Sequence, residues 1–196
     1  MKKRSAIILA GGKNTRMGIN KAFLKVNQTK IIDYQVDTLR SLCDEVIIVT
    51  NKPEDFEYLG VSLIEDLIKD RGPLSGIYSG LSVATSPYAL VMACDMPYLD
   101  RKLIEFMFKE CSGYDAVVPV SYRHLQPLHA IYSKNCLKPI IASVENLTLK
   151  VSSFYNQVSV RYISETEIKN FVNPERAFFN INTPDDLRLY LQRFSN

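Results

Sequence analysis

The sequence has few of the residues that metal sites need and no long apolar run. It contains only two histidines and four cysteines, and no Cys-x-x-Cys pair occurs among Cys43, Cys94, Cys111 and Cys136. This spacing argues against a structural zinc site. No stretch approaches the roughly 20 consecutive apolar residues that cross a bilayer. We therefore expect no zinc centre and no membrane partner.

The amino-terminal segment lacks the apolar run of a secretory signal. The basic residues at positions 2–4 are followed by apolar residues only from Ala6 to Ala10, before a glycine pair interrupts them. A signal peptide has roughly 7–15 apolar residues at this point. We expect a cytoplasmic protein whose thiols stay free in a reducing compartment.

The sequence has no long cluster of residues that carry the same charge. The formal net charge is +3, and the lysines and arginines are spread out apart from those in the first four positions. A nucleic-acid-binding domain usually has a dense basic patch with interleaved aromatic residues. We therefore expect no nucleic-acid partner. The length of 196 residues and the 46% hydrophobic content suit a single α/β domain over residues 1–196.

Short apolar runs alternate with helical patterns in the first half of the chain. Runs rich in Val and Ile, without strict alternation, predict strands that are covered on both faces at 5–10, 45–50, 61–66 and 88–95. Apolar residues at helical spacing predict helices at 31–42, 74–84 and 100–110, the last with Asp100 as N-cap. This alternation predicts a three-layer α/β fold, Rossmann-like, with an open, mostly parallel sheet and helices on both faces.

The second half is less regular. Its patterns predict strands at 114–120, 127–132 and 157–163 and a helix at 134–144. A further strand is expected in the Phe-Phe-Asn-Ile-Asn segment before the last helix. That helix has Thr183 as N-cap, Pro184 at its first position and Asp186 at capping-box spacing.

Residues 9–21, LAGGKNTRMGINK, follow the first predicted strand and contain no acidic residue. Gly11 and Gly12 would let backbone N–H groups face an anion without an intervening Cβ. The glycine spacing fits neither the Walker A loop nor the dinucleotide fingerprint. Lys13, Arg16 and Lys21 could neutralise a nucleotide triphosphate, and a solvated basic loop is the alternative.

Two aspartates follow predicted strands. Asp66 ends one apolar run and Asp95 comes directly after another. Parallel strands deliver their carboxyl ends to one edge of a sheet, so both should lie near the glycine loop. A carboxylate beside a phosphate-binding loop indicates a divalent cation, Mg²⁺ above all. Either aspartate alone could instead be a turn or N-cap residue.

Other polar residues give weaker signals. Asn180 and Asn182 precede the last helix and could donate to phosphate oxygens, although such residues are also common in turns. His124 and His129 have no evident Ser or Cys partner, so we predict no nucleophilic dyad.

Five segments in this order, LAGGKNTRMGINK, DRGPLSGI, CDMP, QPLHAIY and NINTPDDL, resemble the molybdenum cofactor guanylyltransferase family. That family belongs to the glycosyltransferase-A-like nucleotidyltransferases. The resemblance extends from about Ala6 to Leu189. The first segment is shared with sugar-phosphate and cytidylyl transferases, so it indicates nucleotidyl transfer without specifying the acceptor. The later segments together favour the guanylyltransferases.

The resemblance implies roles for individual residues. Leu9, Ala10 and Gly11 would form the nucleotide-binding turn, with Arg16 at the triphosphate and Lys21 at the phosphates. Asp66 would help to hold the guanine nucleotide, and Asp95 would ligate Mg²⁺. Asn180 and Asn182 match positions on the molybdopterin side. The catalytic set would then be Lys21, Arg16 and Asp95.

Two positions depart from the family pattern or leave it open. Asn20 stands where the family often has aspartate, which puts the local charge partner of Lys21 in doubt. The asparagine of the nucleotide pocket after the second strand corresponds to either Thr50 or Asn51.

The implied reaction transfers GMP from GTP to the phosphate of molybdopterin and releases pyrophosphate. GTP and molybdopterin are the expected partners, together with molybdoenzymes or cofactor-biosynthesis proteins. The alternatives are a nucleotidyltransferase of the same fold that uses CTP or a sugar-phosphate acceptor, and a non-catalytic nucleotide-binding regulator.

Overall fold

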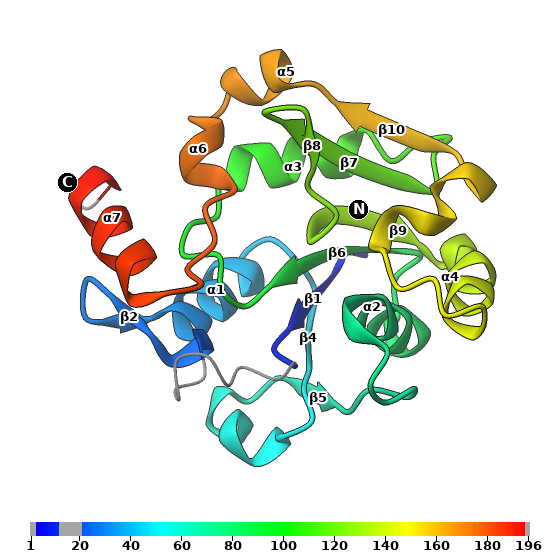
Figure 1. The fold of residues 1–196 in the computed structure, drawn as a ribbon, viewed down its shortest axis with the longest axis horizontal. Helices are drawn as coiled ribbons and strands as arrows, with labels where there is room; N and C mark the ends of the chain where they lie inside the picture. Colours follow the sequence, from blue (N-terminus) through cyan, green and yellow to red (C-terminus); the bar gives the residue numbers. More distant parts are fainter. Residues whose placement is uncertain (1–2, 12–20, 195–196) are drawn as a thin grey trace.

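A mixed sheet forms the centre of the computed structural model, which describes residues 3–11 and 21–194 (Figure 1). The strand order is β10-β7-β9-β6-β1-β4-β5, and the short β8 pairs with β7. The strands are β1 (Ser5–Leu9), β4 (Glu45–Val49), β5 (Ser62–Ile64), β6 (Tyr88–Ala93), β7 (Ala116–Ser121), β8 (His124–Leu125), β9 (His129–Ser133) and β10 (Val160–Ile163). A separate hairpin pairs β2 (Lys25–Val26) with β3 (Thr29–Lys30).

Most neighbouring strands of this sheet are parallel. β1 pairs in parallel with both β4 and β6, β4 with β5, and β7 with β10. β9 is antiparallel to both β6 and β7, and it therefore begins at the edge where those two strands end. The predicted mostly parallel sheet is confirmed, with β9 and the short β8 running in the opposite direction.

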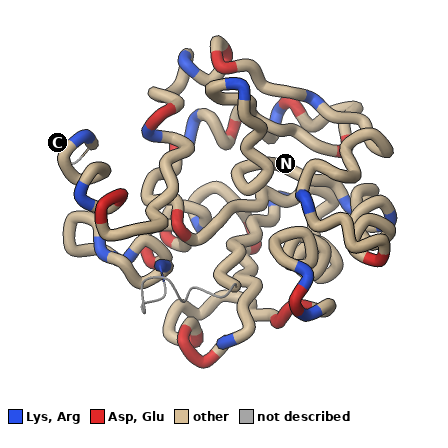
Figure 2. Tube along the Cα trace, in the orientation of Figure 1, with Lys and Arg blue, Asp and Glu red and all other residues tan. Residues whose placement is uncertain are grey.

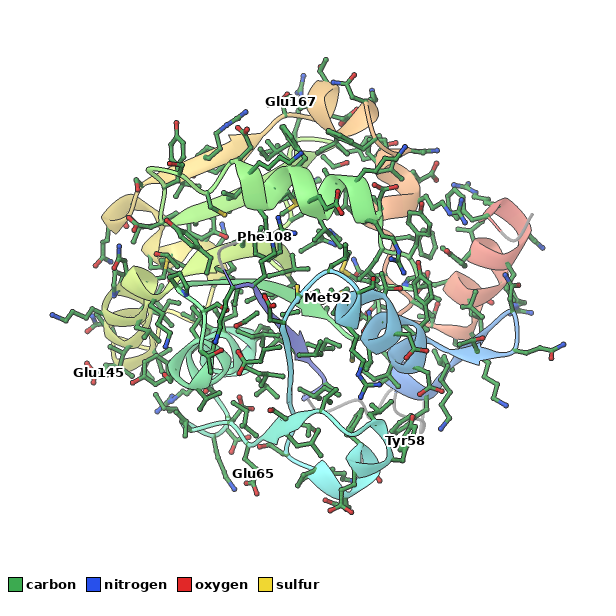
Figure 3. All side chains as sticks on the ribbon, turned by 180° about the vertical axis from the view of Figure 1, so that it is seen from behind. Tyr58, Glu65, Met92, Phe108, Glu145 and Glu167 are labelled. Carbon is green, nitrogen blue, oxygen red and sulfur yellow. The ribbon has the colours of Figure 1, made fainter. Side chains whose placement is uncertain are left out.

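Helices cover both faces of the sheet. The helices are α1 (Ile31–Arg40), α2 (Gly72–Val83), α3 (Arg101–Lys109), α4 (Leu137–Glu145), α5 (Glu165–Lys169), α6 (Pro174–Ala177) and α7 (Pro184–Phe194). Ile8 and Met92 pack in one core cluster with residues of α1 and α3, and Met92 lies near the middle of the molecule (Figure 3). Ile7 and Val91 face the opposite way, into a second cluster with α2 and α4. This alternation produces the predicted three layers.

Short 3-10 helices, η1 (Lys21–Phe23), η2 (Pro53–Asp55), η3 (Glu57–Leu59), η4 (Lys134–Cys136) and η5 (Val151–Gln157), connect the main elements. No helix in the described part of the chain combines the length and the hydropathy of a membrane span. Basic and acidic residues are interspersed along the described trace (Figure 2).

The predicted helix caps are confirmed. Asp100 accepts a hydrogen bond from the backbone N–H of Leu103 at 2.8 Å, at the start of α3. Before α7, the N–H of Thr183 donates to Asp186, and the N–H of Asp186 donates to the Thr183 hydroxyl, at 2.8 and 3.1 Å. Each cap satisfies backbone donors that have no partner within the helix.

The strand expected just before α7 does not form. Phe178 follows α6 as its C-cap, and the next residues form no ladder with any described strand. Ile181 donates one backbone hydrogen bond to the carbonyl of Asp95, at 2.9 Å. Its side chain packs with Phe179 and Tyr190 in a small third cluster beneath α7. The apolar residues that suggested a strand are therefore explained by packing against a helix.

α2 approaches β1 closely because glycine faces the strand. A Cβ at Gly80 would lie 2.5 Å from Cγ2 of Ile7 and 2.9 Å from its Cδ1. Ile7 is fully buried, so it has no free space into which to move. The Gly80 position therefore sets how near α2 can lie to the sheet.

We predict that Gly80→Ala destabilises the protein although alanine favours helices. Overpacking at the upper end of its usual range, about 3 kcal/mol, outweighs a helix-propensity gain of about 1 kcal/mol. The free energy of unfolding in urea should fall by about 2 kcal/mol. The control is Val83→Ala on an exposed position of α2, which should change it by less than about 0.5 kcal/mol. A Gly80→Ala protein as stable as the wild type would contradict the close packing.

Candidate functional site

The carboxyl ends of four strands form one continuous edge of the sheet. Backbone hydrogen bonds continue beyond the paired residues, from Ala10 N to Val49 O at 2.9 Å, from Thr50 N to Ile64 O at 2.8 Å and from Cys94 N to Leu9 O at 3.2 Å. β1, β4, β5 and β6 thus end side by side (Figure 1). The residues that follow these strands share this edge, as parallel strands require.

One half of the edge is built around Asp66. Nδ2 of Asn51 donates to Oδ2 of Asp66 at 3.3 Å. A Cβ at Gly11 would lie 3.6 Å from the same oxygen and 4.0 Å from Asn51 Nδ2. A Cβ at Gly76, in α2, would lie 3.5 Å from Oδ1. Glycines therefore keep open the space around a carboxylate and an amide.

The turn after β4 places Thr50 and Asn51 differently. Thr50 is 2% exposed, and its hydroxyl accepts a hydrogen bond from the backbone N–H of Lys52 at 3.2 Å. Asn51 is exposed and contacts Asp66. Asn51 is therefore the residue that faces this half of the edge.

The other half is built around Asp95. Nζ of Lys21, at the start of η1, lies 3.5 Å from Oδ2 of Asp95 and 2.6 Å from Oδ1 of Asn182. The Lys21 and Asp95 side chains are only 17% and 18% exposed. The Ile181 N–H bond to the Asp95 carbonyl attaches the segment that carries Asn182. Three segments that are far apart in the sequence thus meet at one ammonium group.

Both carboxyl groups have unused hydrogen-bonding capacity. Oδ1 of Asp66 and Oδ1 of Asp95 are buried and have no hydrogen-bond partner in the described part of the chain. Burial raises the pKa of Asp95, and the Lys21 ammonium acts in the opposite direction. Burial likewise raises the pKa of Asp66, against the Asn51 hydrogen bond and the charge of Lys69. Such oxygens are suited to accept a hydrogen bond or a cation from a ligand.

Asp95 fits a magnesium site that the substrate completes. Mg²⁺ in phosphate-transferring sites is usually held by one or two carboxylates, with phosphates and water filling its other positions. Asp95 offers the unpartnered Oδ1 for this purpose. Within residues 3–11 and 21–194, no three His, Cys, Asp or Glu side chains gather into a site made of protein alone.

The other predicted residues are placed differently. Leu9 and Ala10 have buried side chains, so only their backbone can reach a ligand. Asn180 is exposed and donates to the carbonyl of Phe178 at 3.2 Å, whereas Asn182 contacts Lys21. Gly12 and Arg16, and with them Lys13 and Asn20, lie outside the described residues.

The two histidines take no part in the Lys21–Asp95 contacts. His124 is exposed in β8. His129 is buried at the start of β9 and lies edge-on to Phe178, with ring centroids 5.3 Å apart. Burial lowers the pKa of His129 to about 4.

Gln35 was not among the residues that the sequence patterns predicted for the site. It lies in α1, and its side chain reaches the backbone on both sides of Asp95. A signal was present, because Ile32, Val36 and Leu39 mark the buried face of this helix and Gln35 lies on the same face. A polar residue at a core position needs a buried partner.

The chain matches known proteins over most of its length. Residues 6–158 match the family described as the MobA-like NTP transferase domain. A protein of Pelotomaculum thermopropionicum named "Probable molybdenum cofactor guanylyltransferase" is 42% identical over 95% of this chain and 91% of its own length. The chain belongs to the molybdenum cofactor guanylyltransferase family. The resemblance seen in the sequence motifs is therefore confirmed.

A second relative and a solved structure agree with this family assignment. A Desulfosudis oleivorans protein named "Molybdenum cofactor guanylyltransferase" is 38% identical, covering 93% of this chain and 92% of its own. The crystal structure of molybdopterin-guanine dinucleotide biosynthesis protein A from Archaeoglobus fulgidus has a TM-score of 0.84 at 25% identity, covering 97% and 98% of the two chains. These matches make the chain a nucleotidyltransferase and confirm the predicted fold class.

We predict that Lys21→Met raises the pKa of Asp95 further. The ammonium favours the charged carboxylate, so without it burial acts unopposed by this charge. The carboxyl carbon of Asp95, followed by NMR in metal-free buffer, should titrate at higher pH in the variant. Lys25→Met removes an exposed cation from β2 and should leave the titration unchanged. A lower pKa in Lys21→Met would show that the two side chains do not interact as described.

Proposed function

We propose that this chain transfers the GMP unit of GTP to the terminal phosphate of molybdopterin, which releases pyrophosphate and forms the guanine dinucleotide cofactor. The observation that carries the proposal is the contact of Lys21 with both Asp95 and Asn182, beside the Asp66–Asn51 pair. A cation, a carboxylate and an amide that meet where parallel strands end support this proposal.

The Asp66 half suits a guanine nucleotide. Guanine presents adjacent N–H donors on one edge, and a carboxylate can accept two hydrogen bonds side by side. Oδ1 of Asp66 has no partner among the described residues, and Asn51 fixes the position of Oδ2. The backbone of Leu9, Ala10 and Gly11 would contact the nucleotide between its base at Asp66 and its phosphates at Lys21. Gly12 and Arg16 are proposed at the triphosphate, as the family resemblance implies.

The reaction requires charge neutralisation above all. An oxygen of the molybdopterin phosphate forms a bond to the α-phosphorus of GTP, and the bond from that phosphorus to the β-phosphate oxygen breaks, so its electron pair leaves with pyrophosphate. Two anions must approach each other, and a fixed positive charge lowers that barrier. Lys21 supplies this charge, and Asn182 orients its ammonium.

Mg²⁺ bound through Asp95 would supply further charge neutralisation at the phosphates. Asn180 and Asn182 are proposed on the molybdopterin side. We also expect a cytoplasmic enzyme that contacts the proteins which deliver molybdopterin or receive the finished cofactor.

Product mass tests the reaction directly. The protein is incubated with molybdopterin, Mg²⁺ and one nucleoside triphosphate at a time, and the products are analysed by mass spectrometry. We expect the mass of one GMP unit to be added with GTP and no addition with CTP. Turnover with CTP alone, or transfer to a sugar phosphate instead of molybdopterin, would replace the proposal with another nucleotidyl transfer.

We predict that Lys21→Ala and Asp95→Ala each lower turnover by about 100-fold or more, because each removes a group aimed at the charge of the transition state. Both variants should stay folded by circular dichroism. Lys109→Ala, which removes an exposed lysine of α3, is the matched control and should retain full turnover. Near-normal rates in both site variants would favour the non-catalytic regulator.

A further inference from the structure

The fully buried side chain of Gln35, in α1, holds the loop after β6, residues 94–100. Nε2 of Gln35 donates to the carbonyl of Ala93 at 3.0 Å and to the carbonyl of Met96 at 2.8 Å. One of these carbonyls precedes Asp95 and the other follows it. Both amide hydrogens of Gln35 therefore fix the backbone that presents the Asp95 carboxylate.

The chemistry of Gln35 is unusual for its position. Oε1 is buried and has no hydrogen-bond partner in the described part of the chain. An unpaired buried acceptor destabilises a fold. Apart from Thr38, the buried neighbours of Gln35 on this face of α1 are apolar. Packing alone therefore does not account for glutamine here, whereas the two donated hydrogen bonds do.

α1 also holds the far end of the same loop. The Tyr34 hydroxyl lies 3.3 Å from the carbonyl of Leu99 and 3.4 Å from its N–H. At its first residue, α1 is joined to the segment of Lys21 by a hydrogen bond from Ile31 N to Leu24 O at 2.9 Å. One helix thus fixes the loop of Asp95 relative to the cation that Asp95 contacts.

We propose that Gln35 is a positioning residue that holds Asp95 in the orientation needed to bind the divalent cation. The proposal rests on the proposed function, in which Asp95 ligates that cation. Gln35 touches neither substrate nor metal. It acts by fixing the carbonyls on both sides of Asp95 and thereby the position of the Asp95 carboxylate.

Gln35→Met tests this role, because methionine has a similar volume and donates no hydrogen bond. Loss of an outer-shell partner lowers metal affinity or activity by about 10- to 100-fold, and we expect that loss in turnover and in the affinity for Mg²⁺. The KM for GTP should stay within about twofold, because the Asp66 half of the site is unchanged. The variant is assayed beside the wild type across a Mg²⁺ titration.

Two measurements do not depend on turnover. Mn²⁺ binding to the protein, followed by electron paramagnetic resonance, should weaken in Gln35→Met. Amide hydrogen exchange should become faster in residues 93–96 and stay unchanged in β10. The matched control is Ser5→Ala, which removes the part-buried hydrogen bond from the buried Ser5 hydroxyl to Glu45, at the opposite end of β1. It should lower the melting temperature without changing Mn²⁺ binding.

Several outcomes would overturn the proposal. Unchanged Mn²⁺ binding and unchanged exchange in a folded Gln35→Met protein would show that Gln35 does not position Asp95. The same conclusion would follow if Ser5→Ala weakened Mn²⁺ binding as much as Gln35→Met does. If Gln35→Met does not fold, Gln35→Asn decides, because its shorter amide cannot reach both carbonyls and must also weaken Mn²⁺ binding. Wild-type protein that transfers no GMP would refute the proposed function, while Mn²⁺ binding and exchange still test Gln35.

Discussion

The ion pair between Lys21 and Asp95 is the contact on which the arrangement of the site depends. It joins residues 74 positions apart, and both side chains are mostly buried. Removing two charges from water is costly unless each is compensated. The ammonium is compensated by Asp95 and by Asn182, while one oxygen of Asp95 has no partner within residues 3–11 and 21–194. The site therefore keeps its cation in place and has capacity left for an incoming ligand.

The reversed direction of β9 explains how the second half of the chain reaches the same edge. His129, the first residue of β9, pairs with Met92 near the end of β6. The Ala93 N–H then bonds to the Leu128 carbonyl at 3.1 Å, so the segment before β9 follows the sheet edge beyond β6. The edge is thereby extended past Asp95, on the side away from Asp66. A two-substrate enzyme needs room on both sides of the reacting groups, and the antiparallel strand extends the edge on that second side.

Local signals in the sequence predicted local structure well. The runs that became β1 and β6 and the caps at Asp100 and Thr183 depend on neighbouring residues. The shared edge of Asp66 and Asp95 followed from the rule for parallel strands. Features that depend on distant partners were not predictable. The direction of β9 is not encoded in its apolar run, and the Ile181 segment lost its expected strand because its partner is α7. Gln35 bonds to backbone 58 and 61 positions away.

Each half of the site is bounded by a different helix. α2 bounds the Asp66 half, because Gly76 places its backbone against Leu9 and Asp66, where a Cβ would lie 3.0 Å from Leu9 Cδ2. α1 bounds the Asp95 half through Gln35 and Tyr34. The two helices pack on opposite faces of the sheet. The sheet between them contributes residues of β1, β4 and β6 to both core clusters. The two halves of the site are thus supported from opposite faces of one sheet.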